Sequence, residues 1–112
     1  MKRKITFLNV AHQDMEELRS YVRKNFGTEV WQTTYQKMKE ALTQIQKFPE
    51  SGVIPDELDN LSIRNYRQIL SGLNRIIYEV GRDAVYIHLI CDARKSFVNL
   101  LLRRILASKT YH

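Results

Sequence analysis

The sequence predicts a small α+β domain, in which a small antiparallel sheet packs against an N-terminal helical hairpin in the order β-αα-βββ-α. Two observations lead to this class. Apolar residues recur at helical spacing through residues 11–47, and branched or aromatic residues are dense in short segments between residues 66 and 91. The 112 residues, 44% of them apolar and 27% charged, fit one folded domain spanning residues 1–112.

The N-terminal part predicts one strand and two helices. Residues 2–8 favour a strand, and Asn9 is a candidate cap for the helix that follows. Gly27 provides a helix stop, and Thr28 is a candidate cap for the second helix. So short a connection predicts that the two helices fold back on each other. Their apolar stripes are Ala11, Met15, Leu18, Val22 and Phe26 in the first helix, and Trp31, Tyr35, Met38, Leu42 and Ile45 in the second.

The remainder predicts three strands and a helix. Pro49 ends the second helix, and residues 53–64 form a connector whose Leu58, Leu61 and Ile63 should pack against the core. Strands are predicted at residues 66–70, 74–80 and 84–91, joined by turns at Ser71-Gly72 and Gly81-Arg82-Asp83, and a last helix at residues 96–107.

The last strand is expected to be central in the sheet because it is rich in branched residues. Strict alternation divides its side chains between the two faces, with Val85, Ile87, Leu89 and Cys91 opposite Tyr86, His88 and Ile90.

Charge is distributed unevenly. The net charge is +6, and the whole surplus lies in residues 64–112, where arginine predominates among the basic residues. Arginine suits bidentate contact with carboxylate or phosphate, so this asymmetry indicates an anionic partner, either nucleic acid or an acidic protein segment. The alternative is a solvated basic surface without a partner.

Several classes of protein are not expected. Cys91 is the single cysteine, which excludes an internal disulfide and suits a reducing cytoplasm. The apolar run at residues 5–8 is too short for a signal peptide, and no run is long enough to span a membrane, so we expect a cytoplasmic protein. His12, His88 and His112 lack metal-ligand spacing, and no glycine-rich phosphate loop is present, so no metal or cofactor is expected.

The remaining candidates for chemistry are basic. Arg67, Arg75 and the Arg94-Lys95 pair lie on or beside neighbouring strands and could hold a phosphate. RNA cleavage without a metal needs a base and a cation. His88 or a tyrosine is a candidate base, although for His88 a packing role in the strand is the alternative. Asp92 fits a turn or capping residue. Arg94 either anchors the fold through a carboxylate or faces a partner.

An ordered set of residues resembles the RelE/ParE superfamily, the toxins of type II toxin–antitoxin pairs, which are often called plasmid stabilisation proteins. The resemblance covers nearly the whole chain and implies the same fold. It is carried by Asp14-Met15-Glu16-Glu17-Leu18, Tyr21-Val22, Phe26-Gly27, Tyr35, Leu42, Phe48-Pro49-Glu50-Ser51-Gly52, Arg67, Asn74-Arg75-Ile76-Ile77-Tyr78, Val85-Tyr86-Ile87 and Asp92-Ala93-Arg94-Lys95.

The superfamily has two branches with different targets. RelE-like toxins cleave messenger RNA on the ribosome, whereas characterised ParE-like toxins poison DNA gyrase, and either activity arrests growth. This chain resembles the ParE-like branch, because its predicted helical hairpin is long and no Tyr or His closely follows Arg94. Asp92 stands where many ParE-like sequences carry His. The resemblance therefore implies a gyrase inhibitor that is not itself an enzyme.

The resemblance also implies a partner and a set of contact residues. A cognate antitoxin should bind through an acidic, partly disordered C-terminal segment that orders across the hairpin and sheet. The residues expected to bind the target or the antitoxin are Arg67, Arg75, Tyr78, His88, Asp92, Arg94, Lys95, Arg103 and Arg104. If the protein is instead a metal-independent mRNA endoribonuclease, Arg67, Arg75, Arg94 and Lys95 should surround the scissile phosphate. A third possibility is an inactive member that only binds its antitoxin.

Overall fold

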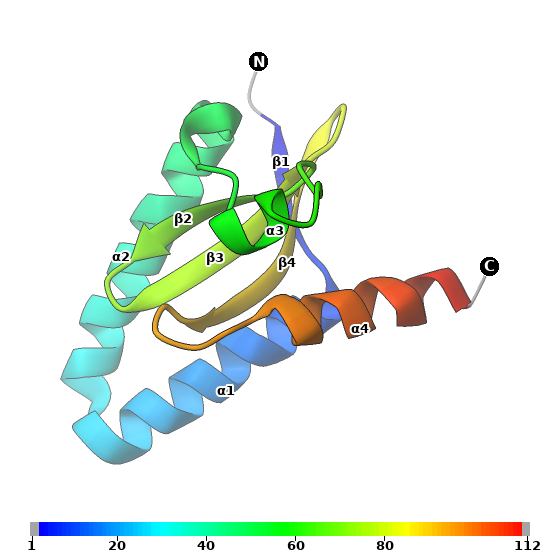
Figure 1. Cartoon of the computed structure of the whole chain (residues 1–112). Helices are drawn as coiled ribbons and strands as arrows, with labels where there is room; N and C mark the ends of the chain where they lie inside the picture. The colour runs from blue at the N-terminus through cyan, green and yellow to red at the C-terminus, as the bar shows by residue number, and fades with distance from the viewer. Residues whose placement is uncertain (1–2, 111–112) are drawn as a thin grey trace.

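The computed structural model describes residues 3–110, with side chains through residue 107, and confirms the predicted class and element order (Figure 1). Two short helical turns, η1 and α3, occur within the predicted connector. None of the helices within residues 3–110 is both long enough and apolar enough to span a membrane. The elements are β1 (Lys4–Phe7), α1 (Asn9–Phe26), α2 (Thr28–Lys47), η1 (Pro49–Ser51), α3 (Asp56–Asp59), β2 (Arg67–Ser71), β3 (Asn74–Val80), β4 (Ala84–Asp92) and α4 (Val98–Thr110).

The four strands form one sheet in the order β1-β4-β3-β2, so β4 is internal, as predicted. The pairs β2–β3 and β3–β4 are antiparallel, whereas β1 pairs with β4 in parallel. The sheet is therefore mixed, and the expectation of a purely antiparallel sheet is wrong at this one pair. Tight turns impose antiparallel pairing on β2, β3 and β4, but β1 reaches β4 through a long crossover that includes α1 and α2.

Gly27 alone separates the two helices of the hairpin. Its φ of 92° lies in a region that glycine adopts without strain, and from this point α1 and α2 diverge (Figure 1). The two predicted side-chain caps are wrong: Asn9 and Thr28 are each the first residue of a helix, and neither Leu8 nor Gly27 before them makes a side-chain cap hydrogen bond.

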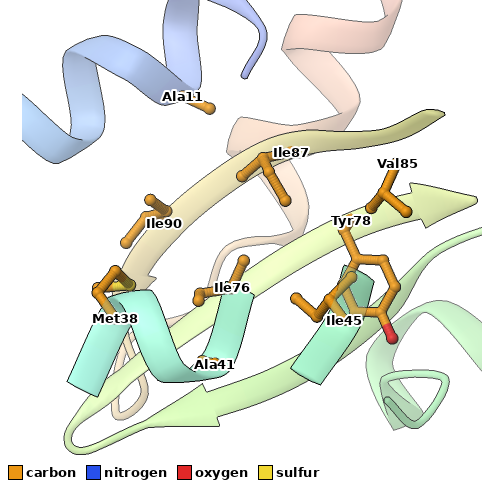
Figure 2. Close-up of a cluster of buried hydrophobic side chains, with 9 residues drawn as sticks. All are labelled: Ala11, Met38, Ala41, Ile45, Ile76, Tyr78, Val85, Ile87 and Ile90. Carbon is orange, nitrogen blue, oxygen red and sulfur yellow. The ribbon is translucent and has the colours of Figure 1, made fainter. Parts of the chain in front are cut away.

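Both long helices cover one face of the sheet, and α3 and α4 cover the other. Figure 2 shows Ala11 of α1 and Met38, Ala41 and Ile45 of α2 facing the strands. The second cluster joins Leu58 of α3, residues at the start of α4 and the opposite sheet face. Each predicted helical stripe is buried only in part, because Phe26 and Tyr35 remain exposed. The connector's Leu58 is buried as predicted, but Leu61 is exposed.

A β-bulge at His88 changes the pattern of β4. Ile77 pairs with Leu89, but Tyr78 pairs with Ile87, so His88 is an extra residue. Beyond it the side chains exchange faces. Ile90 joins Ile87 beneath the long helices, and Leu89 packs with Ile77 on the other side. The predicted strict alternation through residues 84–91 is therefore wrong after His88, because an inserted residue shifts the period of two by one.

The Asp14–Arg104 ion pair supports the bulged edge of β4. β1 stops at Phe7 opposite Ile87, so the following residues of β4 have no strand on that side. Asp14 Oδ2 accepts the Ile90 N–H at 3.0 Å, and Arg104 Nη1 donates to the His88 carbonyl at 3.0 Å. Arg104 also donates to both carboxylate oxygens of Asp14, at 2.8 and 2.9 Å. With side chains only 11% and 17% exposed, this pair joins α1, α4 and β4.

The connector after α2 is fastened to the sheet by Tyr78 and Arg67. The buried Tyr78 hydroxyl donates to the Pro49 carbonyl at 2.7 Å and accepts the Gly52 N–H at 3.0 Å. Arg67 Nη1 donates to the Gly52 carbonyl at 2.8 Å and to the Glu50 carbonyl at 3.3 Å. A Cβ at Gly52 would collide with the Tyr78 hydroxyl, so glycine is required there.

We predict that Asp14→Ala lowers the free energy of unfolding by about 2 to 3 kcal/mol, because it leaves the mostly buried Arg104 guanidinium without its carboxylate and the Ile90 N–H without an acceptor. Asp14→Asn should cost less, since an amide oxygen can still accept that N–H. Urea unfolding monitored by circular dichroism measures both.

The matched control is Arg64→Ala, which removes the exposed Arg64–Asp59 pair and should cost less than about 1 kcal/mol. Equal losses for Asp14→Ala and Arg64→Ala would contradict the structural role of the Asp14–Arg104 pair.

We predict that Tyr78→Phe lowers the free energy of unfolding by about 1 to 2 kcal/mol, because the buried Gly52 N–H and the partly buried Pro49 carbonyl lose their partner. Tyr35→Phe is the control, since Tyr35 is 46% exposed, and it should be close to neutral.

Burial also raises the pKa of Tyr78 above its ordinary value of 10.0. The folded state favours the neutral phenol, so this contribution to stability is complete below pH 10 and is lost as pH rises above that value. The alkaline loss of stability should therefore be smaller in Tyr78→Phe than in wild type. An identical loss in both would contradict this assignment.

Candidate functional site

A groove of about 740 Å³ lies between α1, α2 and the end of the sheet where β4 stops. Its rim includes the β2–β3 turn and the turn after β4. Four of its lining residues are large apolar side chains that the fold leaves exposed: Tyr21, Phe26, Val30 and Leu73. Tyr21 and Phe26 lie in the last part of α1 and Val30 in the first turn of α2, close to Gly27, whereas Leu73 lies in the turn between β2 and β3.

The Asp92–Lys95 turn forms one side of this groove and is held by three contacts of one carboxylate. Asp92 Oδ1 accepts the Arg94 backbone N–H at 2.8 Å and Arg94 Nε at 3.0 Å, and Asp92 Oδ2 accepts Nη2 at 2.7 Å. The Arg94 guanidinium and backbone N–H hold the pKa of Asp92 well below its usual range. Asp92 is thus the turn residue that the sequence predicted, and Arg94 pairs with a carboxylate while its side chain stays 76% exposed.

The turn is also fixed to the sheet. The Ala93 N–H donates to the Leu73 carbonyl at 2.7 Å, and Arg75 Nε donates to the Ala93 carbonyl at 3.2 Å. Arg75 further contacts Glu57 at 2.9 Å and lies over the Phe97 ring at 5.2 Å. With its side chain 17% exposed, Arg75 acts as a support beneath the turn.

His88 lies in a polar cluster on the face covered by α3 and α4. Its Nε2 is 3.0 Å from Glu79 Oε1, and its ring meets the Tyr66 ring edge-on at 4.9 Å. Asn65 Nδ2 donates to the other Glu79 oxygen at 3.0 Å. The His88 side chain is only 14% exposed, which agrees with the packing role and leaves little access for a substrate.

The structure brings together only part of the predicted set. Asp92, Arg94 and Lys95 line the groove. Arg103 is exposed on α4, whereas Arg104 is taken up by Asp14. Arg67 and Tyr78 hold the connector, and Arg75 and His88 are engaged on the opposite face of the sheet. The four basic residues predicted to surround a scissile phosphate therefore do not converge.

The apolar part of the groove is not among the predicted site residues. The helical stripe predicts a buried Phe26, whereas Phe26 is exposed, and Leu73 lies between a predicted turn and a predicted strand. A signal was available, because Phe26 and Val30 flank the helix-ending Gly27 and Leu73 follows the turn glycine Gly72. Apolar residues beside such turns are poorly placed to reach a core.

Among the described residues, no group of three or more His, Cys, Asp or Glu side chains could hold a metal ion.

The charges lining the groove are few and mixed in sign. Asp14 is paired with Arg104 and Asp92 with Arg94. Lys37, Lys95 and Glu17 are the other charged residues along it, and all three are exposed. The lining thus combines an apolar wall with a small number of charges, as in a surface that binds an amphipathic polypeptide.

Comparison with known proteins places this arrangement in a family. A search of curated proteins finds no match. Among solved structures, a chain of the chromosomal ParDE TA system from P. aeruginosa is 12% identical, with a TM-score of 0.68 over 83% of this chain and 98% of that chain. The E. coli toxin RelE, as a double arginine-to-alanine mutant in the free state, is 20% identical, with a TM-score of 0.62 over 94% of this chain and 99% of that chain.

These two likenesses show the fold, and a family profile supplies the membership. The profile described as "ParE toxin of type II toxin-antitoxin system, parDE" matches residues 5–97. That match extends from β1 through β4 to Phe97, the residue before α4, and includes the groove and the Asp92–Lys95 turn. The chain therefore belongs to the ParE toxin family of type II toxin–antitoxin systems.

Proposed function

We propose that this toxin arrests growth by inhibiting DNA gyrase and that a cognate antitoxin neutralises it. The choice of gyrase as the target rests on one observation, which is that the predicted basic side chains are mostly bonded within the fold. Cleavage of RNA requires a base and a cation close to one phosphate. Here Arg67 and Arg75 are bound within the fold on opposite faces of the sheet, and His88 is paired with Glu79.

A ribosome-dependent endoribonuclease is the second candidate, because the fold is shared with RelE. Under this alternative, Arg94 and Lys95 would be the exposed cations at the phosphate, and the ribosome would have to contribute the rest. The third candidate, a member that only binds its antitoxin, would use the groove without acting on a target.

For the antitoxin we propose the groove as the principal docking site. An acidic, amphipathic segment would place apolar side chains on Tyr21, Phe26, Val30 and Leu73 and carboxylates near Arg94 and Lys95. Ordering such a segment costs conformational entropy, so binding depends on burying the exposed apolar wall. The cations then contribute mainly orientation and association rate.

We expect purified toxin to inhibit supercoiling by gyrase and to trap broken DNA, and to leave messages intact in a translating ribosome extract. Codon-positioned cuts would instead establish the endoribonuclease. Silence in both assays, without growth arrest on expression, would leave an antitoxin-binding member.

Arg94→Ala should lose toxicity in the same assays while keeping its fold. The reason is that the Arg94 guanidinium is exposed and therefore well placed to contact a target. An Arg94→Ala variant with a normal unfolding transition and undiminished toxicity would refute this site assignment.

We predict that Leu73→Ala weakens antitoxin binding about tenfold, equivalent to about 1.4 kcal/mol, because it removes an apolar contact at the rim of the groove. Leu73 is 67% exposed, so the fold should be unaffected. Titration calorimetry measures the dissociation constant.

Leu61→Ala is the matched control, since Leu61 is 52% exposed and does not line the groove. Equal affinities for Leu73→Ala and Leu61→Ala would exclude the groove as the docking site.

The affinity of the toxin for its antitoxin should also fall as salt rises. An affinity independent of salt would refute the role of charge.

A further inference from the structure

The edge of the Arg94 guanidinium that best fits a carboxylate is already occupied in the free toxin. Nε and Nη2 lie 3.0 and 2.7 Å from the two oxygens of Asp92, which is the side-on, bidentate arrangement. Yet the Arg94 side chain is 76% exposed and the Asp92 side chain is 27% exposed. The pair therefore stands at the side of the groove where an incoming segment would meet it.

Asp92 can release the guanidinium and still keep a hydrogen bond. Its Oδ1 also accepts the Arg94 backbone N–H at 2.8 Å, so the turn retains its internal cap after the side chains separate. The turn is held independently by the Ala93 N–H bonded to the Leu73 carbonyl and by Arg75 bonded to the Ala93 carbonyl. Exchange at Arg94 thus requires one exposed ion pair to open and no rearrangement of the backbone.

The surroundings favour a polypeptide carboxylate over a nucleic-acid backbone as the incoming group. A phosphate chain is held by many cations along its path. Apart from the Asp92–Arg94 pair, the exposed charged residues of the groove are Lys37, Lys95 and Glu17. The rest of the lining includes an apolar wall. A segment that buries apolar side chains and carries a carboxylate at one position matches both features.

We propose that Asp92 occupies Arg94 as an internal competitor, and that the antitoxin binds by exchanging its own carboxylate for that of Asp92. This inference rests on the proposed antitoxin complex. It makes Asp92 a residue that weakens the complex in wild type, although it lies inside the binding site. It also gives a physical account of the aspartate at this turn.

The key variant is Asp92→Asn. An asparagine Oδ1 can still accept the Arg94 N–H, while the charged partner of the guanidinium is lost. We expect the cognate antitoxin, measured by titration calorimetry, to bind Asp92→Asn about two- to fivefold more tightly than wild type, the range expected on removing an exposed ion pair. Arg94→Gln should bind more weakly, and adding Asp92→Asn to Arg94→Gln should bring no further gain.

A second measurement uses acetate instead of the antitoxin. In ¹⁵N-labelled toxin at constant ionic strength, millimolar acetate should shift the Arg94 Nε–Hε signal of Asp92→Asn and leave that of wild type unchanged. This arm tests the competition even if no antitoxin complex forms, so its failure is distinct from failure of the proposed function.

Two outcomes would overturn the inference. One is an Asp92→Asn variant that folds normally, as judged by its unfolding transition, and binds the antitoxin no better than wild type. In that case Asp92 supports the binding geometry of Arg94 and does not compete for it. The other is tighter binding of a single-stranded oligonucleotide without tighter binding of the antitoxin, which would assign the released arginine to nucleic acid.

Discussion

The arrangement of this fold depends on one ion pair, Asp14–Arg104, at the point where the sheet loses a strand. β1 is short, and beyond Ile87 it no longer covers the edge of β4. Asp14 from α1 bonds the Ile90 N–H and Arg104 from α4 bonds the His88 carbonyl in its place. A carboxylate and a guanidinium thus replace a stretch of β-ladder, and the same two side chains connect the first and last helices. Unpaired backbone groups at this half-buried edge would otherwise be costly.

The supported bulge determines which side chains reach the groove. Because His88 is an extra residue, Ile90 faces the long helices and Asp92 emerges on the groove side at the end of β4. Without the insertion, the period of two would send these positions to the opposite face. The basic turn therefore faces the groove because of a strand irregularity that is held from outside the strand.

Most of the fold was predictable because local patterns determine it. Helical spacing, the stop at Gly27 and the turns between the strands give the element order without long-range information. Two of the failures share one cause. The parallel partner of β1 and the bulge at His88 depend on contacts between distant segments. Asp14 and Arg104, for example, are separated by 90 positions in the chain. A single sequence contains no local signal for such a contact.

The same limit explains why the candidate site was only partly predictable. The charge surplus of residues 64–112 suggested a broad basic surface, but Arg67, Arg75 and Arg104 are bound to carbonyl oxygens and carboxylates within the fold. Composition counts these arginines equally with Arg94, although the Arg75 and Arg104 side chains are each 17% exposed and the Arg94 side chain is 76% exposed. A mostly buried arginine that also bonds a backbone carbonyl stabilises the fold, whereas an exposed arginine can exchange its carboxylate partner for another.

That difference bears on how neutralisation could work. Arg94 has two proposed roles. It contacts the target of the toxin, and it exchanges the carboxylate of Asp92 for that of the antitoxin. A single guanidinium cannot use the same edge for both contacts at once. If both proposals hold, the antitoxin prevents toxicity by occupying the turn itself, and no change in the toxin fold is required. The supports beneath the turn, from Leu73 and Arg75, fit this mechanism because they keep the backbone in place whichever carboxylate Arg94 holds.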